Sequence, residues 1–305
     1  MPTVQEMKSK MRLPAIAAPM FLVSGPDLVL AANKAGIIGT FPANNARTID
    51  TLEEWFDRIT KTVKPDSPPW AVNIMVHKTY TRMQEELNLA IKYRVPIIIT
   101  ALGSPAAIVD QVHGYGGLVL ADVNSVTFAQ KAAATGVDGL VLVAAGAGGH
   151  TGMISGFAFA PAVREFFNGI IVLGGAIGTG QAVRAAELLG ADFAYLGTRF
   201  IPSTESMAPQ AYKEMLITSK AEDIILSASM TGVPANWLRA SLVAAGYDPH
   251  NMPEKKAMEL GRPEDSGPKR WKEVWSAGQG VGSIHKIEPV SEIVDRLVAE
   301  YKSVT

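Results

Sequence analysis

The amino-acid sequence predicts an α/β protein built on a (β/α)8 TIM barrel. Within the first two-thirds of the chain, eight short apolar runs rich in β-branched residues are separated by segments of helical period. Most of these runs are continuously apolar rather than alternating, which is typical of parallel strands covered on both faces. Eight strand–helix units in about 200 residues favour a closed barrel, and a doubly wound open sheet is the alternative.

The boundaries of these units are marked by short local signals. The eight expected strands occupy residues 13–20, 36–43, 70–76, 95–102, 117–123, 136–145, 169–177 and 191–198. Three glycines, Gly36, Gly136 and Gly190, stand where a helical segment ends and the next strand opens. Ser24 predicts the start of the first barrel helix, with Asp27 in the capping-box position.

The regular alternation stops after Phe200, and the next segment is richer in Met, Trp, Pro and charged residues. We expect a barrel domain of residues 1–202 and 286–305. Residues 203–285 would then form a helical, lid-like insertion between the eighth strand and the eighth helix. This insertion would lie over the barrel mouth, where active sites of this fold form.

Three parts of the C-terminal third have distinct expectations. Residues 207–219 are expected to be helical, and the charged residues 253–274 to be a solvated surface segment. Residues 289–304 have the apolar period of the closing barrel helix. Trp237, Trp271 and Trp275 are large apolar groups in a polar region, so we expect them to be buried. They would form a barrel roof or a subunit contact, or belong to a lid that shapes the substrate pocket, and dimerisation through the lid would give both in a homodimer.

Composition excludes several classes of function. The chain has 28 Lys and Arg against 29 Asp and Glu, a net charge of −1, so nucleic-acid and membrane partners are not expected. It has no cysteine, which excludes disulfides, thiolate nucleophiles and Cys-ligated metals. The histidines lack the spacing of a metal motif, so no metal is expected either. We expect a cytoplasmic protein, because no signal or membrane-spanning segment is evident.

The segment AGAGGHTG, residues 145–152, directly follows the sixth strand. Its glycines, Gly148 and Gly149 among them, allow the backbone to approach a flat or phosphorylated ligand closely. His150 stands beside them at the catalytic end of the barrel and has the side chain best suited to proton transfer near neutrality. His150 is therefore the candidate catalytic residue, and a glycine-rich turn with an incidental histidine is the alternative.

Glycines also end the seventh and eighth strands, in GGAIGTG (174–180) and GTRF (197–200). These two loops are the common phosphate site of TIM barrels. Backbone N–H groups at Gly174, Gly175 and Gly197, with the Thr198 hydroxyl, would surround a phosphate. Arg199 would add charge there or pair with an acid of the neighbouring unit, and tight packing is the alternative role of the glycines.

Taken in order, these motifs resemble one family. AAPM (17–20), VN (72–73), AGAGGHTG, GGAIGTG, GTRF and SAGQGVGSI (276–284) are similar to the motifs of the nitronate monooxygenases, formerly 2-nitropropane dioxygenases, which are FMN-dependent TIM barrels. The resemblance implies that FMN is the cofactor, held through its phosphate by the two loops described above. It also implies further contacts to the flavin ring from residues in four other segments: Ala18, Pro19, Met20, Asn73, Gly148, Gly149 and Gln279.

One position departs from the family. Many relatives have a lysine near the flavin in the fifth strand, where this chain has Asp122. A carboxylate there would oppose an anionic reduced flavin unless Asp122 is protonated or points away.

The resemblance implies oxidative denitrification of alkyl nitronates and nitroalkanes with molecular oxygen. His150 would remove the α-proton of a nitroalkane or act as an electrostatic partner of a nitronate. The alternative is an NAD(P)H-dependent FMN reductase of quinones or enoyl thioesters, since those enzymes share nearly all the motifs. A barrel that binds a phosphorylated metabolite without redox chemistry is a third, more distant possibility.

Overall fold

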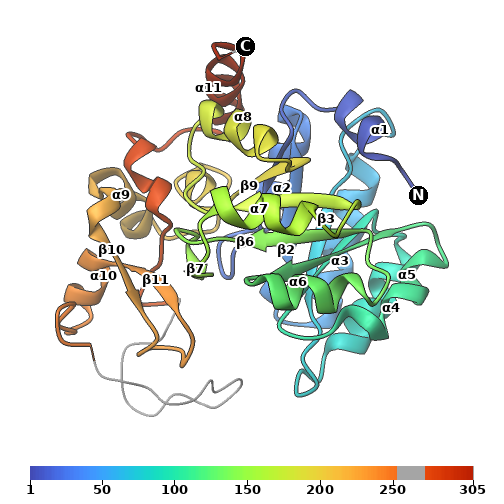
Figure 1. The fold of residues 1–305 in the computed structure, drawn as a ribbon, viewed down its shortest axis with the longest axis horizontal. Coiled ribbons are helices and arrows are strands. Elements are labelled where there is room, and N and C mark those ends of the chain that lie inside the picture. Colours follow the sequence, from blue (N-terminus) through green and yellow to red (C-terminus); the bar gives the residue numbers. More distant parts are fainter. Residues whose placement is uncertain (253–271, 305) are drawn as a thin grey trace.

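A computed structural model describes residues 1–252 and 272–304 of the chain. Eight parallel strands close into a barrel, because the first strand pairs with both the second and the last (Figure 1). The strands are β1 (Ala15–Ala17), β2 (Ile38–Pro42), β3 (Ala71–Met75), β4 (Ile97–Ala101), β5 (Leu118–Val123), β6 (Gly139–Val143), β8 (Ile170–Gly174) and β9 (Phe193–Leu196). All eight lie within the predicted runs, so the TIM barrel is confirmed and the open sheet is excluded.

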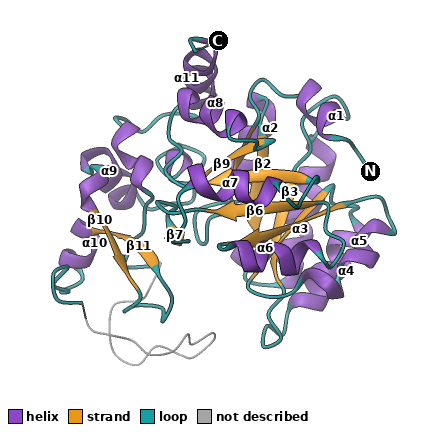
Figure 2. Ribbon diagram, in the orientation of Figure 1, coloured by secondary structure: helices purple, strands orange, loops and turns teal. Residues whose placement is uncertain are grey.

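Helices surround the barrel and alternate with its strands (Figure 2). They are α2 (Pro26–Ala35), α3 (Ile49–Thr62), α4 (Met83–Lys92), α5 (Val109–His113), α6 (Val126–Ala133), α7 (Gly156–Arg164), α8 (Gly180–Leu188) and α11 (Val290–Lys302). A short N-terminal helix, α1 (Val4–Ser9), precedes the first strand. No helix in the described ranges is both long and apolar enough to cross a membrane.

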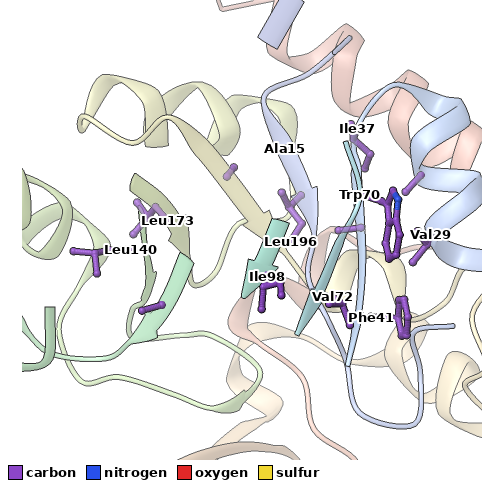
Figure 3. Close-up of a cluster of buried hydrophobic side chains, with 14 of the residues drawn as sticks. Ala15, Val29, Ile37, Phe41, Trp70, Val72, Ile98, Leu140, Leu173 and Leu196 are labelled. Atoms are coloured by element: carbon purple, nitrogen blue, oxygen red, sulfur yellow. The ribbon is translucent and has the colours of Figure 1, made fainter. Parts of the chain in front are cut away.

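The largest apolar cluster fills the space between the outer face of the barrel and its helices. Strand residues such as Val72 and Leu196 pack there with helical residues such as Val29 (Figure 3). Phe41 and Trp70 stack in the same layer, with ring centroids 6.4 Å apart. Since each strand is covered by helices on this side, its outward side chains must be apolar, as the continuous apolar runs required.

A second cluster fills the barrel interior. It contains Ile16, Ile99, Leu120, Val141 and equivalent residues of the other strands, all buried. Met7 of α1 belongs to the same cluster, so the short helix contributes to it. Side chains two positions apart on a strand face the same side, so the next inward positions lie at the carboxyl ends of the strands. Polar residues occupy several of those positions, which are described below.

At helix α2, the predicted C-terminal end is confirmed, whereas the predicted N-terminal cap is not. Gly36 ends α2 in the left-handed region at φ +89°, as its position indicated. The capping role predicted for Ser24 is wrong, because α2 has Gly25 as its N-cap and no side-chain cap. The Ser24 hydroxyl instead accepts a hydrogen bond from the Met20 N–H, and Asp27 pairs with Arg58. Ser24 therefore braces the loop before the helix rather than the helix itself.

The segment after β9 contains strands as well as helices. Its elements are α9 (Gln210–Thr218), β10 (Ile224–Ser227), β11 (Ala235–Leu238) and α10 (Arg239–Ala244). Strand β11 lies between β10 and β7 (Gly149–His150), so β7, which comes from the loop after β6, completes a three-stranded sheet. The helix predicted at 207–219 is confirmed as α9. Most of the expected surface segment 253–274 lies outside the described residues.

Trp237 is fully buried within this segment, in a small core with Met230, Leu242 and Val274. Trp275 stacks on Tyr212 at a centroid distance of 5.0 Å. Trp237 and Trp275 are therefore both packed against other described residues, and Trp271 lies outside the described residues.

Candidate active site at the barrel mouth

A polar layer lies above the apolar barrel interior. Asn73, Asp122 and Tyr195 each stand two residues beyond an inward-facing apolar residue of β3, β5 and β9. Asn73 Nδ2 lies 3.5 Å from Asp122 Oδ2, at the outer limit of a hydrogen bond. Asp122 Oδ1 and the Tyr195 hydroxyl are shielded from solvent and have no hydrogen-bond partner within the described residues. Such buried polar atoms point to a ligand that would complete their bonding.

Burial dominates the electrostatics of this layer. Desolvation raises the pKa of Asp122 to about 7. Desolvation also raises the pKa of Tyr195 well above its ordinary value, and the charge of Asp122 adds to that shift. Tyr195 therefore stays protonated over the physiological range, and Asp122 keeps its proton below about pH 7, where the floor of the mouth offers neutral hydrogen-bond donors.

The loop after β1 carries Ala18, Pro19 and Met20 and forms one side of the mouth. Asn45 fixes this loop, because its Nδ2 donates to the carbonyls of Met20 and Ser24. Ala18 and Met20 face Gly197 after β9, where an added Cβ would lie 3.7 Å from the Ala18 Cβ and 3.6 Å from the Met20 sulfur. The loop and the end of β9 thus enclose one corner of the mouth.

The glycine-rich loop after β6 packs against the C-terminal segment around Gln279. A Cβ on Gly148 would lie 2.8 Å from the Gly278 nitrogen, so only glycine permits this approach. The Gln279 N–H donates to the carbonyl of Gly146, and the Gly278 N–H donates to Thr198 Oγ1 at 2.8 Å. Residues 80 or more positions apart in the sequence are thereby joined at one rim.

His150 is held by the insertion. It lies on β7, opposite Ala235 of β11, and Gly149 lies opposite Asn236. The buried Asn236 side chain donates to the carbonyl of Ala147 at 2.7 Å, and the Thr151 N–H donates to the carbonyl of Pro234. The backbone on both sides of His150 is therefore attached to the segment after β9.

The two expected phosphate loops are adjacent, because β8 and β9 pair. Packing accounts for Gly174 and Gly175: a Cβ at Gly174 would press on the Tyr195 side chain, and one at Gly175, with φ +136°, would lie 2.8 Å from the Ala145 carbonyl oxygen. Tight packing, the alternative role, therefore explains Gly174 and Gly175. Their backbone N–H groups can still bind an anion.

Arg199 forms an ion pair with an acid of the neighbouring unit, which was one of its two predicted roles. It is buried and pairs with Glu288 at 3.0 Å, on the segment before α11. Burial lowers the pKa of its guanidinium, while the Glu288 carboxylate opposes that shift. This ion pair anchors the loop after β9 to the segment before α11.

Sequence reasoning missed Tyr195 and Asn236. Tyr195 could have been found as the polar residue two positions before Gly197 in an otherwise apolar strand. Asn236 gave no local signal, since its partner is 89 residues away. No group of three metal-ligating side chains occurs in the ranges 1–252 and 272–304.

Comparison with known proteins identifies the family to which the chain belongs. The sequence model of the nitronate monooxygenase family matches residues 3–300. A nitronate monooxygenase of Paraburkholderia phytofirmans is 25% identical over 349 aligned positions, covering 95% of this chain and 92% of that protein. An octahydroindene-carboxyl-CoA dehydrogenase of Rhodococcus jostii is 27% identical over 230 positions, covering 75% of this chain and 64% of that protein.

Solved structures share the fold. FabK of Thermotoga maritima superposes with a TM-score of 0.80 at 22% identity, covering 99% of this chain and 97% of that one. A nitroalkane oxidase of Streptomyces ansochromogenes also gives 0.80 at 22% identity, covering 97% and 98% of the two chains. The matched region spans only 62% to 64% of the length of the first curated relatives. Because the family model covers nearly the whole sequence, this chain belongs to the nitronate monooxygenase family of oxidoreductases.

Proposed function

We propose that the protein is an FMN-dependent nitronate monooxygenase, which converts alkyl nitronates or nitroalkanes by oxidative denitrification with molecular oxygen. The family match across residues 3–300 carries this proposal. The polar floor of the barrel mouth supports it, since the mouth is where TIM-barrel active sites form.

The residues present fit a flavin. Asp122 Oδ1 and the Tyr195 hydroxyl are buried polar atoms without described partners, and a ring bearing both acceptors and donors would satisfy them. Ala18 and Met20 offer an apolar side to the same space. Bound FMN would supply the electron chemistry, taking electrons from the substrate and passing them to oxygen.

We propose that the residues identified from the sequence hold FMN in the following way. The ring would lie against Ala18, Pro19, Met20, Gly148 and Gly149. Its polar edges would face three side chains, Asn73, Asp122 and Gln279. Its phosphate would be held by the backbone N–H groups of Gly174, Gly175 and Gly197, with the Thr198 hydroxyl turned toward the same anion site.

Thr198 suits this role because its hydroxyl already accepts the Gly278 N–H, which leaves the hydroxyl hydrogen available to donate. The bond from Gly278 therefore fixes the position of the Thr198 oxygen, and the hydroxyl hydrogen can still be donated to the phosphate.

His150 would handle the proton of the substrate. A neutral nitroalkane must lose its α-proton before oxidation, and an imidazole at the mouth can accept it. A nitronate is already anionic and needs only an electrostatic partner. The sheet pairing of β7 with β11 would fix the direction of the imidazole, because the backbone of His150 is held by Ala235.

A second function is favoured by one observation. The Rhodococcus jostii relative is a dehydrogenase named for a carboxyl-CoA compound, so some similar chains act on thioesters. The alternative is therefore an NAD(P)H-dependent FMN reductase of enoyl thioesters or quinones. Asp122, which replaces the lysine of many relatives, leaves the redox preference of the site open to either chemistry.

The insertion, residues 203–285, would shape the substrate pocket in both cases. Its attachment to β7 supports a roof of fixed geometry beside His150. We also propose a cytoplasmic location. The monooxygenase would act on a small-molecule substrate with molecular oxygen as the second substrate, and the reductase would use NAD(P)H instead.

An anaerobic titration tests the proposal. The purified protein should carry yellow FMN, and its visible absorption should be bleached by an alkyl nitronate but not by NADH or NADPH. Bleaching by reduced nicotinamide alone would favour the reductase. A protein that purifies without flavin and does not bind added FMN would contradict both.

A further inference from the structure

The floor of the barrel mouth holds an acid with no countercharge. Asp122 stands on β5, and its Oδ1 has no solvent access and no described partner. On the adjacent strand β6, Val141 stands in register with Asp122, and on β4 the inward Ile99 lies one layer deeper, in register with Leu120; both are apolar members of the interior cluster. Two strands away on β3, Asn73 is uncharged and lies at the limit of hydrogen-bond distance.

The only other titratable group that interacts with this acid in the described residues is Tyr195, which is itself neutral over the physiological range. Among the described residues, no lysine, arginine or histidine contributes to the ionisation of Asp122, and desolvation is the cause of its raised pKa. An ionised carboxylate in such surroundings would be a buried, unpaired charge.

We propose that Asp122 works as a neutral carboxylic acid that donates a hydrogen bond to an acceptor atom of the bound flavin ring. This inference rests on the proposed function, because it assigns the flavin as the ligand. This donor is present only while the acid keeps its proton. Flavin affinity should therefore fall as Asp122 ionises, because the carboxylate would then face the acceptor that it had bonded.

The sign of the pH effect follows from the raised pKa. Below about pH 7 Asp122 is protonated, so the protein binds the flavin. Above that value each further pH unit lowers the fraction of protein with protonated Asp122 by about tenfold. If only this form binds, the affinity for the flavin falls by about tenfold per pH unit. Removing the titratable group should remove this dependence.

Riboflavin is the suitable probe, because it lacks the phosphate, which has an ionisation of its own near pH 6. Its dissociation constant would be measured on apoprotein by flavin fluorescence from pH 6 to pH 8. We expect about a tenfold weakening for the wild type. Asp122→Asn keeps the shape and a donor but cannot ionise, so its affinity should match that of the wild type at pH 6 and stay nearly constant. Asp110→Asn, at an exposed position on α5, is the control and should behave as the wild type.

Infrared difference spectra of the apoproteins give a readout independent of the flavin. The wild type minus Asp122→Asn spectrum should contain the carbonyl band of a protonated carboxylic acid at pH 6, and this band should be lost at higher pH. Parallel pH curves for the two proteins, or no such band at pH 6, would overturn the role of Asp122. If neither protein binds riboflavin or FMN at pH 6, the proposed function itself is overturned.

Discussion

At the scale of single residues, kinetic measurements can distinguish whether His150 acts as a general base or only orients the substrate. A general base is needed to deprotonate a nitroalkane but not to use a preformed nitronate. We predict that His150→Asn lowers kcat/KM for a neutral nitroalkane by about a hundredfold or more, and for its nitronate by less than about tenfold. Initial rates with both forms of one substrate would check this. Equal losses would assign His150 to orientation alone.

Gly197 gives the sharpest test of the phosphate site. A Cβ there meets only ordinary contacts, at 3.6 Å from Met20 and 3.7 Å from Ala18, so Gly197→Ala should fold and keep FMN. Gly197→Asp should weaken FMN binding by more than about a hundredfold, because a carboxylate a few ångströms from the phosphate costs several kcal/mol. Flavin content and the FMN dissociation constant would be compared for the two variants. Retention of FMN by the Asp variant would contradict the assignment.

Gly175 is unsuitable for the same test. Its φ of +136° and the close Ala145 carbonyl make any side chain there strained, whatever the loop binds. Loss of cofactor from a Gly175 variant would report on folding, so Gly197 is the better position.

At the scale of elements, the pairing of β7 with β11 attaches the insertion to the strand that carries His150. Asn236 fastens the backbone that leads into β7 by its bond to Ala147. We predict that Asn236→Ala lowers kcat severalfold and costs about 1–3 kcal/mol of stability, because a buried acceptor loses its donor. Steady-state kinetics and denaturant unfolding would measure both effects.

Asn33→Ala is the matched control for this variant. Asn33 is buried to a similar degree and also donates from Nδ2 to a backbone carbonyl, that of Pro68, but it lies on α2. It should lose comparable stability and keep kcat. If both variants lost kcat equally, the effect of Asn236 would be general destabilisation rather than the positioning of His150.

At the scale of the whole molecule, a buried ion-pair cluster ties the end of the chain to the barrel. Glu288 binds Arg199 after β9, Arg296 of α11 and Lys286 at once. Although burial opposes ionisation, the bonds from Lys286 and Arg199 hold the pKa of Glu288 below its ordinary value. The closing helix and the loop after β9 therefore depend on one carboxylate.

We predict that Glu288→Gln lowers the free energy of unfolding by about 3 kcal/mol at pH 7, because it leaves buried Arg199 without its countercharge. The lowered pKa means that this stabilisation is present above the unfolded-state value of 4.5 and is lost as pH falls through the native value. The difference between wild type and variant should shrink below pH 4.5. Urea unfolding at pH 7 and pH 4 would measure it.

Glu292→Gln provides the comparison, since Glu292 is about half exposed and pairs only with Lys286 among the described residues. Its loss should cost less than about 1 kcal/mol. An equal cost for both variants would show that the buried cluster contributes no more than a surface pair.

The sequence by itself determined the barrel. Parallel strands covered on both faces must be continuously apolar, and helix ends favour glycine, so the strands and the end of α2 at Gly36 followed from local pattern. The motif residues at the carboxyl ends of the strands were predictable for a related reason, since closure of the barrel brings those ends together.

Only the tertiary structure decided how distant segments meet. Contacts between residues far apart in the chain decide the partner of Arg199, the strands of the insertion and the bond from Asn236 to Ala147. They also decide that Asp122 Oδ1 has no partner among the described residues. Periodicity and capping report on neighbours within one or two turns, whereas these contacts are set by the way whole elements pack. For that reason the sequence predicted where the candidate active site lies, and the folded chain determined the charge and hydrogen bonding of the residues gathered there.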